Sequence, residues 1–221
     1  MARRILGHGA TGGEGTLAAH SGGSCQASLS LDGGVTWRVL HSFEGGCPRG
    51  AAAGSNLVAA GTDQRFEFVV PARTRSGAAL FAWTWIAVSG NRGEFYMNCA
   101  RVEIVGGADD DLRARPHMFL GDMHIAGHIA AGQCASVAGA AVAYPHPGEN
   151  ATRDQVDGIP FTTPSDGDCV APGAKGADAP ATTTTTAKTA RPAPTAAVKL
   201  PSIMLDVDET AGRCGCVCAI E

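Results

Sequence analysis

The chain has 221 residues, and 44% of them are hydrophobic, so it can bury one sizeable core and we expect one main domain. Its net charge of −4, without any run of lysine or arginine, excludes the electrostatic footprint of a nucleic-acid-binding protein or of one that binds an anionic membrane surface. No window approaches the roughly 20 apolar residues of a membrane span, and a neutral partner such as a glycan fits this composition better.

Short strand-like runs alternate with turn residues between residues 25 and 104. Residues 27–31 alternate in polarity, residues 32–34 make a glycine-containing turn, and residues 36–40 follow as the hairpin partner. Further strands are expected at residues 65–70, 79–88 and 97–105. Short strands without a sustained helical period predict an all-β fold, an immunoglobulin- or fibronectin-like antiparallel β-sandwich with long loops.

The pattern loosens into loops after residue 107, with candidate edge strands at residues 118–120 and 140–144. We interpret this part as an extension that wraps on the same core, so that residues 1–172 make one domain. Residues 173–200 are almost entirely Ala, Thr, Pro, Gly and Lys, which cannot bury a core and predict a disordered, O-glycosylated linker.

The eight cysteines and the sequon at Asn150 favour an oxidising, glycosylating compartment, so we expect a secreted glycoprotein. Residues 1–7 begin basic but reach glycine where a secretory signal needs about 7–15 apolar residues. We therefore expect either non-standard secretion or an incomplete N-terminus. The tail, residues 201–221, resembles no known domain, and the role of its Cys214, Cys216 and Cys218 is left open.

Two disulfides are predicted from the order of the cysteines. Cys25 and Cys47 flank the hairpin, and Cys134 and Cys169 bracket the loop-rich extension. In the chain-entropy model, closing loops of this size stabilises the fold by roughly 3–4 kcal/mol each.

Two other patterns have simpler explanations than a binding site. Residues 7–12 match G-x-G-x-x-G, but glycines fall where the helix of a dinucleotide-binding fold would run, which indicates a glycine-rich leader. His124 and His128 would share a helix face and could hold a metal, but the glycines around them favour a loop.

Four segments follow the order of one known family: HSGGSCQ at residues 20–26, EGGCP at 44–48, AWTW at 82–85 and NRGEFYMNC at 91–99. Together they resemble the fungal lytic polysaccharide monooxygenases of auxiliary activity family eleven, and the match covers about residues 16–105. The later PHMF at 116–119 and YPHPG at 144–148 resemble the C-terminal portion of that family.

The resemblance implies a sandwich that holds one copper ion on a flat surface facing crystalline polysaccharide, most often chitin. It implies that His20 supplies an imidazole to the copper, that Tyr96 lies on the axial side and that Glu94 is the acid near the oxygen site, although Gly93 is an extra residue beside Glu94. No cofactor beyond copper is implied. It also implies that Cys99 is left without a partner, because the family pairs this cysteine with one in an N-terminal segment that has no counterpart here.

The same residues have ordinary structural explanations. His20 beside glycines suits a solvated loop, Tyr96 suits a strand aromatic with a satisfied hydroxyl, and His41 suits an exposed strand end. Trp83 and Trp85, two residues apart, are expected to pack in the core. Nevertheless, imidazole nitrogens suit copper, a phenol can cap its axis weakly, and a carboxylic acid can deliver protons.

Two functions are therefore carried forward. The first is a monomeric copper monooxygenase that cleaves polysaccharide, chitin above all, with an external electron donor, and that is impaired in this chain because no histidine stands at position 1. The alternative is a non-catalytic polysaccharide-binding protein or a degenerate, secreted relative of the enzyme.

Overall fold

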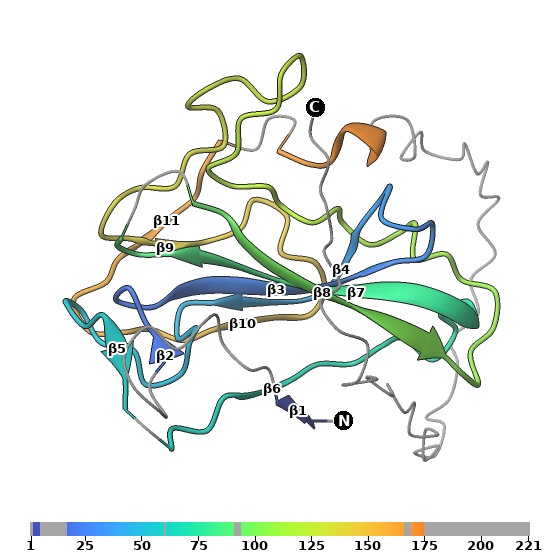
Figure 1. The fold of residues 1–221 in the computed structure, drawn as a ribbon, viewed down its shortest axis with the longest axis horizontal. Helices are drawn as coiled ribbons and strands as arrows, with labels where there is room; N and C mark the ends of the chain where they lie inside the picture. The colour runs from blue at the N-terminus through green and yellow to red at the C-terminus, as the bar shows by residue number, and fades with distance from the viewer. Residues whose placement is uncertain (1, 5–16, 60, 91–93, 166–168, 175–221) are drawn as a thin grey trace, which may run out of the picture.

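A computed structural model of the protein describes residues 2–4, 17–59, 61–90, 94–165 and 169–174. The elements in chain order are β1 (Ala2–Arg4), β2 (Leu17–Ala18), β3 (Gly23–Ser30), β4 (Arg38–Glu44), β5 (Leu57–Val58), β6 (Arg65–Glu67), β7 (Gly77–Ala87), β8 (Tyr96–Ile104), β9 (Ala141–Val142), β10 (Ala151–Arg153), β11 (Phe161–Thr162) and the 3-10 turn η1 (Pro172–Ala174). Five strands form one sheet in the order β10-β4-β3-β7-β8 (Figure 1). The described chain is essentially all-β, as predicted, and is consistent with a β-sandwich.

The predicted hairpin is present as β3 and β4, which pair antiparallel from Cys25 opposite Phe43 to Leu29 opposite Arg38. Its turn is closed by Asp32, whose carboxylate accepts hydrogen bonds from the backbone and the hydroxyl of Thr36. The runs expected at residues 79–88 and 97–105 form β7 and β8, shifted by no more than two residues. Short strand-like runs between turns therefore predicted four strands of the sheet, β3, β4, β7 and β8.

The two faces of this sheet differ in chemistry. The apolar face carries the side chains Cys25, Ala27, Leu29, Phe43, Trp83 and Trp85, all buried in one cluster with Phe66 and Phe68. The polar face is the opposite side of β3, where Ser24, Gln26, Ser28 and Ser30 are also buried. The tryptophans pack in the core, as expected.

The extension covers the polar face, while the segment around β6 lies on the other side of the sheet (Figure 1). Met118, Phe119, Leu120 and Tyr144 of the extension pack with Ala82 and Ile86 of β7. Side chains of the extension thus pack on the same sheet whose other face carries the apolar core.

The prediction of an edge strand at residues 118–120 is wrong. Its three amides donate to three different acceptors: Met118 N to Trp37 O at 3.0 Å, Phe119 N to Gln26 Oε1 at 3.0 Å and Leu120 N to Cys169 O at 2.8 Å. Because the partners belong to different segments, no ladder forms. The strand expected at residues 65–70 is shorter, since only Arg65–Glu67 pairs, and it pairs with β1.

One strand of the main sheet was not predicted. β10 adds to β4 in parallel, with Thr152 opposite Phe43 and Arg153 opposite Glu44. All three residues of β10 are exposed, so it lacks the alternation that marks a half-buried strand. β9 falls within the run expected at residues 140–144 and also pairs in parallel, with β11.

Both predicted disulfides are present, between Cys25 and Cys47 and between Cys134 and Cys169. The expectation that Cys99 is unpaired is wrong, because Cys99 is disulfide-bonded. The other four described cysteines pair with one another, so none of them is its partner. The leader motif at 7–12, the linker beyond residue 174 and the tail lie outside the described residues, and their predictions stand as made. In the described part, no helix has the length and apolar character needed to cross a membrane.

Candidate functional site

His20 lies in a tight turn that leads into β3. Its φ of 41° and that of Ser21, 63°, are in the left-handed region that non-glycine residues rarely adopt. The turn is held by backbone hydrogen bonds from Gly22 N to Ala19 O at 2.6 Å and from Ser89 N to His20 O at 2.9 Å. The surrounding chain therefore fixes a strained backbone at this histidine.

Aromatic rings hold the imidazole of His20 in place. It stacks on Tyr96, with ring centroids 6.3 Å apart and planes 9° from parallel, and on Trp85 at 5.7 Å. Trp85 and Tyr96 stack on each other at 4.9 Å, since they are register partners on β7 and β8. Three segments distant in sequence thus meet at one end of the sheet.

Glycines make room for this packing. A Cβ at Gly90 would lie 2.9 Å from His20 Nδ1, and one at Gly23 would lie 2.1 Å from Ile86 O. A side chain at Gly90 would therefore displace the imidazole.

Glu94 accepts a hydrogen bond from the hydroxyl of Tyr96. Burial, followed by this hydrogen bond and the negative charge of Glu94, raises the pKa of Tyr96 to about 12. At neutral pH the phenol therefore stays protonated and acts as a neutral donor to the carboxylate.

The structure thus brings together the three residues that the sequence singled out, His20, Glu94 and Tyr96. The ring nitrogens of His20 make no hydrogen bond to any described residue, so they are available to a ligand. The described residues hold no group of three or more His, Cys, Asp or Glu side chains able to bind a metal. One imidazole and one phenol fit part of a copper site, and a planar nitrogen array needs further nitrogens.

The other histidine candidate is structural. Neither histidine is in a helix: His128 lies in a turn, and the exposed His124 lies just before it. His128 Nε2 lies 2.7 Å from Val170 O, which ties this turn to the segment after Cys169. The sequence predicted His41 at an exposed strand end, and this prediction is wrong. His41 is half-buried within β4, where its ring stacks on Phe43 at 4.1 Å.

Sequence reasoning assigned Trp85 to the core alone and missed its contact with the histidine. The signal was available in the strand pattern, because alternation puts Trp85 on the same face as its neighbour Tyr96 once β7 and β8 are paired. The position of His20 against this pair depends on the turn geometry, which no local pattern reveals.

Comparison with known proteins supports the resemblance. The chain is 50% identical over 90 residues, 41% of its length and 35% of the relative's, to AA11 family lytic polysaccharide monooxygenase A of Aspergillus fumigatus. It is 42% identical over 96 residues to the AA11 family enzyme of Aspergillus oryzae and 40% identical over 96 residues to AA11 family lytic polysaccharide monooxygenase B of Aspergillus fumigatus.

The chain spans only 35%, 22% and 23% of the lengths of these relatives, and no protein-family model matches it. The resemblance to AA11 lytic polysaccharide monooxygenases is confirmed for about 40% of the chain.

Proposed function

We propose that this chain carries part of a copper-dependent monooxygenase that cleaves insoluble polysaccharide oxidatively, with chitin as the favoured substrate. The observation that carries the proposal is the convergence of His20, Tyr96 and Glu94 at one end of the sheet. The likeness to three AA11 lytic polysaccharide monooxygenases supports it.

In this proposal His20 would hold the copper through an imidazole nitrogen, and Tyr96 would present its neutral hydroxyl to the metal. When bound, the metal supplies redox chemistry that activates oxygen or peroxide with electrons from an external donor. The carboxylate of Glu94, which accepts the hydrogen bond of Tyr96, would take up and pass on protons close to that position, the role of a positioned general acid or base. Trp85 and Gly90 fix the orientation of the imidazole.

We further propose that this chain binds copper weakly. Among the described residues, His20 alone offers a nitrogen at this position, and the hydroxyl of Tyr96 is already engaged by Glu94. A single imidazole gives copper little of the planar nitrogen field that Cu(II) prefers. The oxidative cleavage of polysaccharide would thus be impaired in this chain.

The setting proposed for the protein is extracellular and monomeric. Two disulfides in the described region suit an oxidising compartment. The sequon residue Asn150 is only half-buried at the start of β10, and its side-chain amide donates to Leu40 O at 3.3 Å. Because Asn150 is partly accessible, we propose it as the glycan acceptor.

A second function is favoured by the same donor count. A site with one imidazole and one engaged phenol suits a non-catalytic polysaccharide-binding protein that keeps the sandwich and lacks redox chemistry. The two functions differ in whether chitin is cleaved to oxidised oligosaccharides when copper and a reductant are present.

Copper titration of the full chain, followed by electron paramagnetic resonance, tests the site. His20→Ala is expected to weaken Cu(II) binding at least about tenfold, a loss of about 1.4 kcal/mol, while the matched control His124→Ala leaves binding unchanged. Restoring an upstream segment that begins with a histidine should give tight, tetragonal copper binding and reductant-dependent release of oxidised oligosaccharides from chitin.

Equal copper binding by His20→Ala and the parent chain, with or without the added histidine, would refute the metal site. Binding of chitin without oxidised products in the histidine-extended chain would favour the non-catalytic function instead.

A further inference from the structure

A cavity of 740 Å³, lined by both polar and apolar side chains, opens at the opposite edge of the sheet from His20. One row of register partners crosses all five strands, namely Thr152, Phe43, Cys25, Trp85 and Tyr96. Four strand spacings separate the ends of this row, which is about 19 Å. Thr152 and Phe43 line the cavity, so it is distinct from the candidate copper site.

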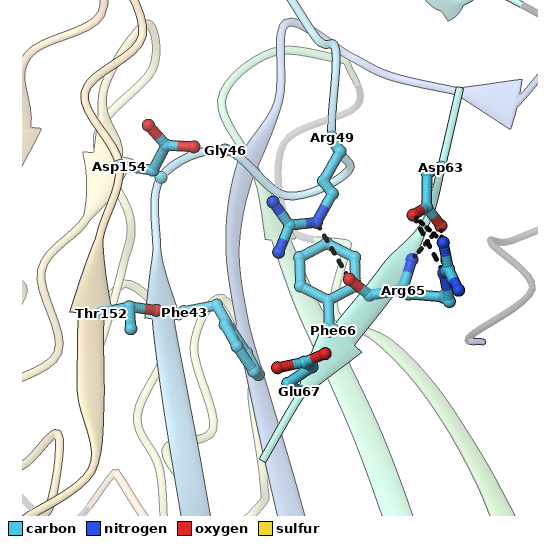
Figure 2. Close-up of a pocket in the computed structure, with 10 residues that line it drawn as sticks. Phe43, Gly46, Arg49, Asp63, Arg65, Phe66, Glu67, Thr152 and Asp154 are labelled. Carbon is cyan, nitrogen blue, oxygen red and sulfur yellow. Dashed lines mark hydrogen bonds and ion pairs between the residues drawn. The ribbon is translucent and has the colours of Figure 1, made fainter. Parts of the chain in front are cut away.

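Figure 2 shows the arrangement of the walls. Thr152 and Asp154 come from β10 and the residue after it, on one side, while Arg49 and Glu67 face them from the other side. The ring of Phe43 lies between the two walls. The volume is within the range of small-molecule sites, which is roughly 300–1,000 Å³.

Arg49 is held in a fixed orientation. Its backbone exchanges two hydrogen bonds with the side-chain amide of Gln64, at 3.0 and 2.9 Å. Its guanidinium lies over the ring of Phe66 at 4.8 Å, and its Nε donates to Arg65 O at 3.1 Å. The terminal nitrogens of Arg49 have no protein acceptor in the described structure, and they project into the cavity (Figure 2).

Asp154 is fixed by the glycine turn that ends β4. A Cβ at Gly45 would lie 2.1 Å from Asp154 O, and one at Gly46 would lie 2.5 Å from its Oδ2. Asp154 N donates to Glu44 O at 2.8 Å, and the buried carboxylate of Glu44 binds Arg153 at 2.6 Å. The backbone of Asp154 is therefore held in place by its contacts with the turn after β4.

The charges of the cavity do not balance. Asp63 and Arg65 neutralise each other in an ion pair at 2.9 Å. Arg49 then faces two carboxylates, Glu67 and Asp154, for which the described residues provide no hydrogen bond or ion pair to the side chain. The described side chains that line the cavity then sum to a charge of −1, and the described residues form no metal-binding cluster of acids. This combination suits an organic cation that also carries hydrogen-bond acceptors.

We propose that this cavity binds a short oligosaccharide that contains a free, protonated amino sugar. The ammonium group pairs with one of the carboxylates of Glu67 and Asp154, and a hydroxyl of the ligand donates to the other. Arg49 donates to a hydroxyl or ring oxygen, which a simple polyamine lacks. The choice of an amino sugar among protonated amines rests on the proposed function.

Calorimetric titration of the full chain tests the proposal with oligomers of glucosamine, N-acetylglucosamine and glucose of equal length. Glucosamine oligomers should bind best, and the affinity should fall as salt is added. Glu67→Gln and Asp154→Asn should each weaken this binding about two- to fivefold, because both residues are exposed. Glu103→Gln is the matched control, since Glu103 is an exposed carboxylate on β8 outside the cavity.

Equal affinity for the acetylated oligomer would overturn recognition of the amine, and equal affinity for spermine would overturn recognition of the sugar. Unchanged binding in both Glu67→Gln and Asp154→Asn, with unaltered thermal unfolding, would overturn the site itself. His20→Ala should bind the amino sugar normally, and the cavity variants should bind copper as the parent does, so failure of either site is seen separately.

Discussion

The two faces of the five-stranded sheet are both buried, but by different means. On the apolar face, Trp83 and Trp85 pack against Phe43 and Phe66. On the polar face, Gln26 and the serines of β3 are covered by the extension, which contains strands of only two or three residues. A regular core forms where apolar area suffices, whereas an irregular cover depends on individual hydrogen bonds and a disulfide.

Three side-chain contacts illustrate this cover. Gln26 Oε1 accepts from Phe119 N, Ser24 Oγ donates to Val142 O at 2.6 Å, and Glu44 Oε1 accepts from Tyr144 N at 2.7 Å. Each satisfies a buried backbone group of a segment that has no ladder of its own. A buried polar group left without a partner costs about 1–3 kcal/mol, so these contacts decide where the extension can sit.

The largest effect is expected from removing the bridge of the extension. Changing both Cys134 and Cys169 to serine should cost about 4 kcal/mol of unfolding free energy in urea titrations, because the closed loop of 35 residues then gains conformational freedom when the chain unfolds. Hydrogen exchange should rise in the extension and stay slow in β3 and β7. Equal acceleration in the central strands would show that the two faces unfold as one unit.

A smaller loss is expected from Gln26→Leu on the polar face. The substitution keeps the approximate volume but leaves Phe119 N without an acceptor, so unfolding in urea should cost about 2 kcal/mol less. On the apolar face the control Leu29→Met, which also keeps volume, should cost less than about 1.5 kcal/mol. If Gln26→Leu were neutral, hydrogen bonding would not be what holds the cover.

Two serines of the same strand and face provide a sharper comparison. Ser24 donates to Val142 O and accepts from Gly45 N at 3.0 Å, so Ser24→Ala should cost about 1 kcal/mol. The hydroxyl of Ser28 is buried without a partner in the described structure, so Ser28→Ala should cost nothing or stabilise slightly. Thermal unfolding of the two variants checks this order, and a greater loss for Ser28→Ala would contradict it.

The smallest effect concerns the two tyrosines, one on each face, and it is seen only at high pH. Burial raises the pKa of Tyr144 well above its usual 10, and that of Tyr96 reaches about 12. Both pKa values are higher in the folded protein than in the unfolded chain. The two phenols therefore contribute folding stability that is present below pH 10 and is lost as the pH rises toward 12. Ultraviolet titration of Tyr144→Phe should show a single late tyrosinate transition.

In that variant, adding Glu94→Gln should lower the pKa of Tyr96 only partly, because burial is the larger cause of its shift. A return to about 10 would mean that the carboxylate alone sets the ionisation of this phenol.

Short strand-like runs between turns were enough to predict β3, β4, β7 and β8, and the spacing of cysteines was enough for both described disulfides. The four family segments pointed to His20, Glu94 and Tyr96, which do lie together. Their role at a metal stays a prediction. The disulfide of Cys99 was not predicted, because the family resemblance pairs this cysteine with one in the N-terminal segment of the family.

Tertiary structure alone decided which buried groups are polar. In β3 the alternation correctly separates two faces, yet a strand that reads as half-exposed is buried on both sides, because residues about 90 to 120 positions later supply partners for Gln26 and Ser24. The same long-range contacts turned residues 118–120 into an irregular segment and added the exposed strand β10 to the sheet edge. A local pattern determines which way a side chain points, whereas the partner that makes its burial tolerable comes from another part of the chain.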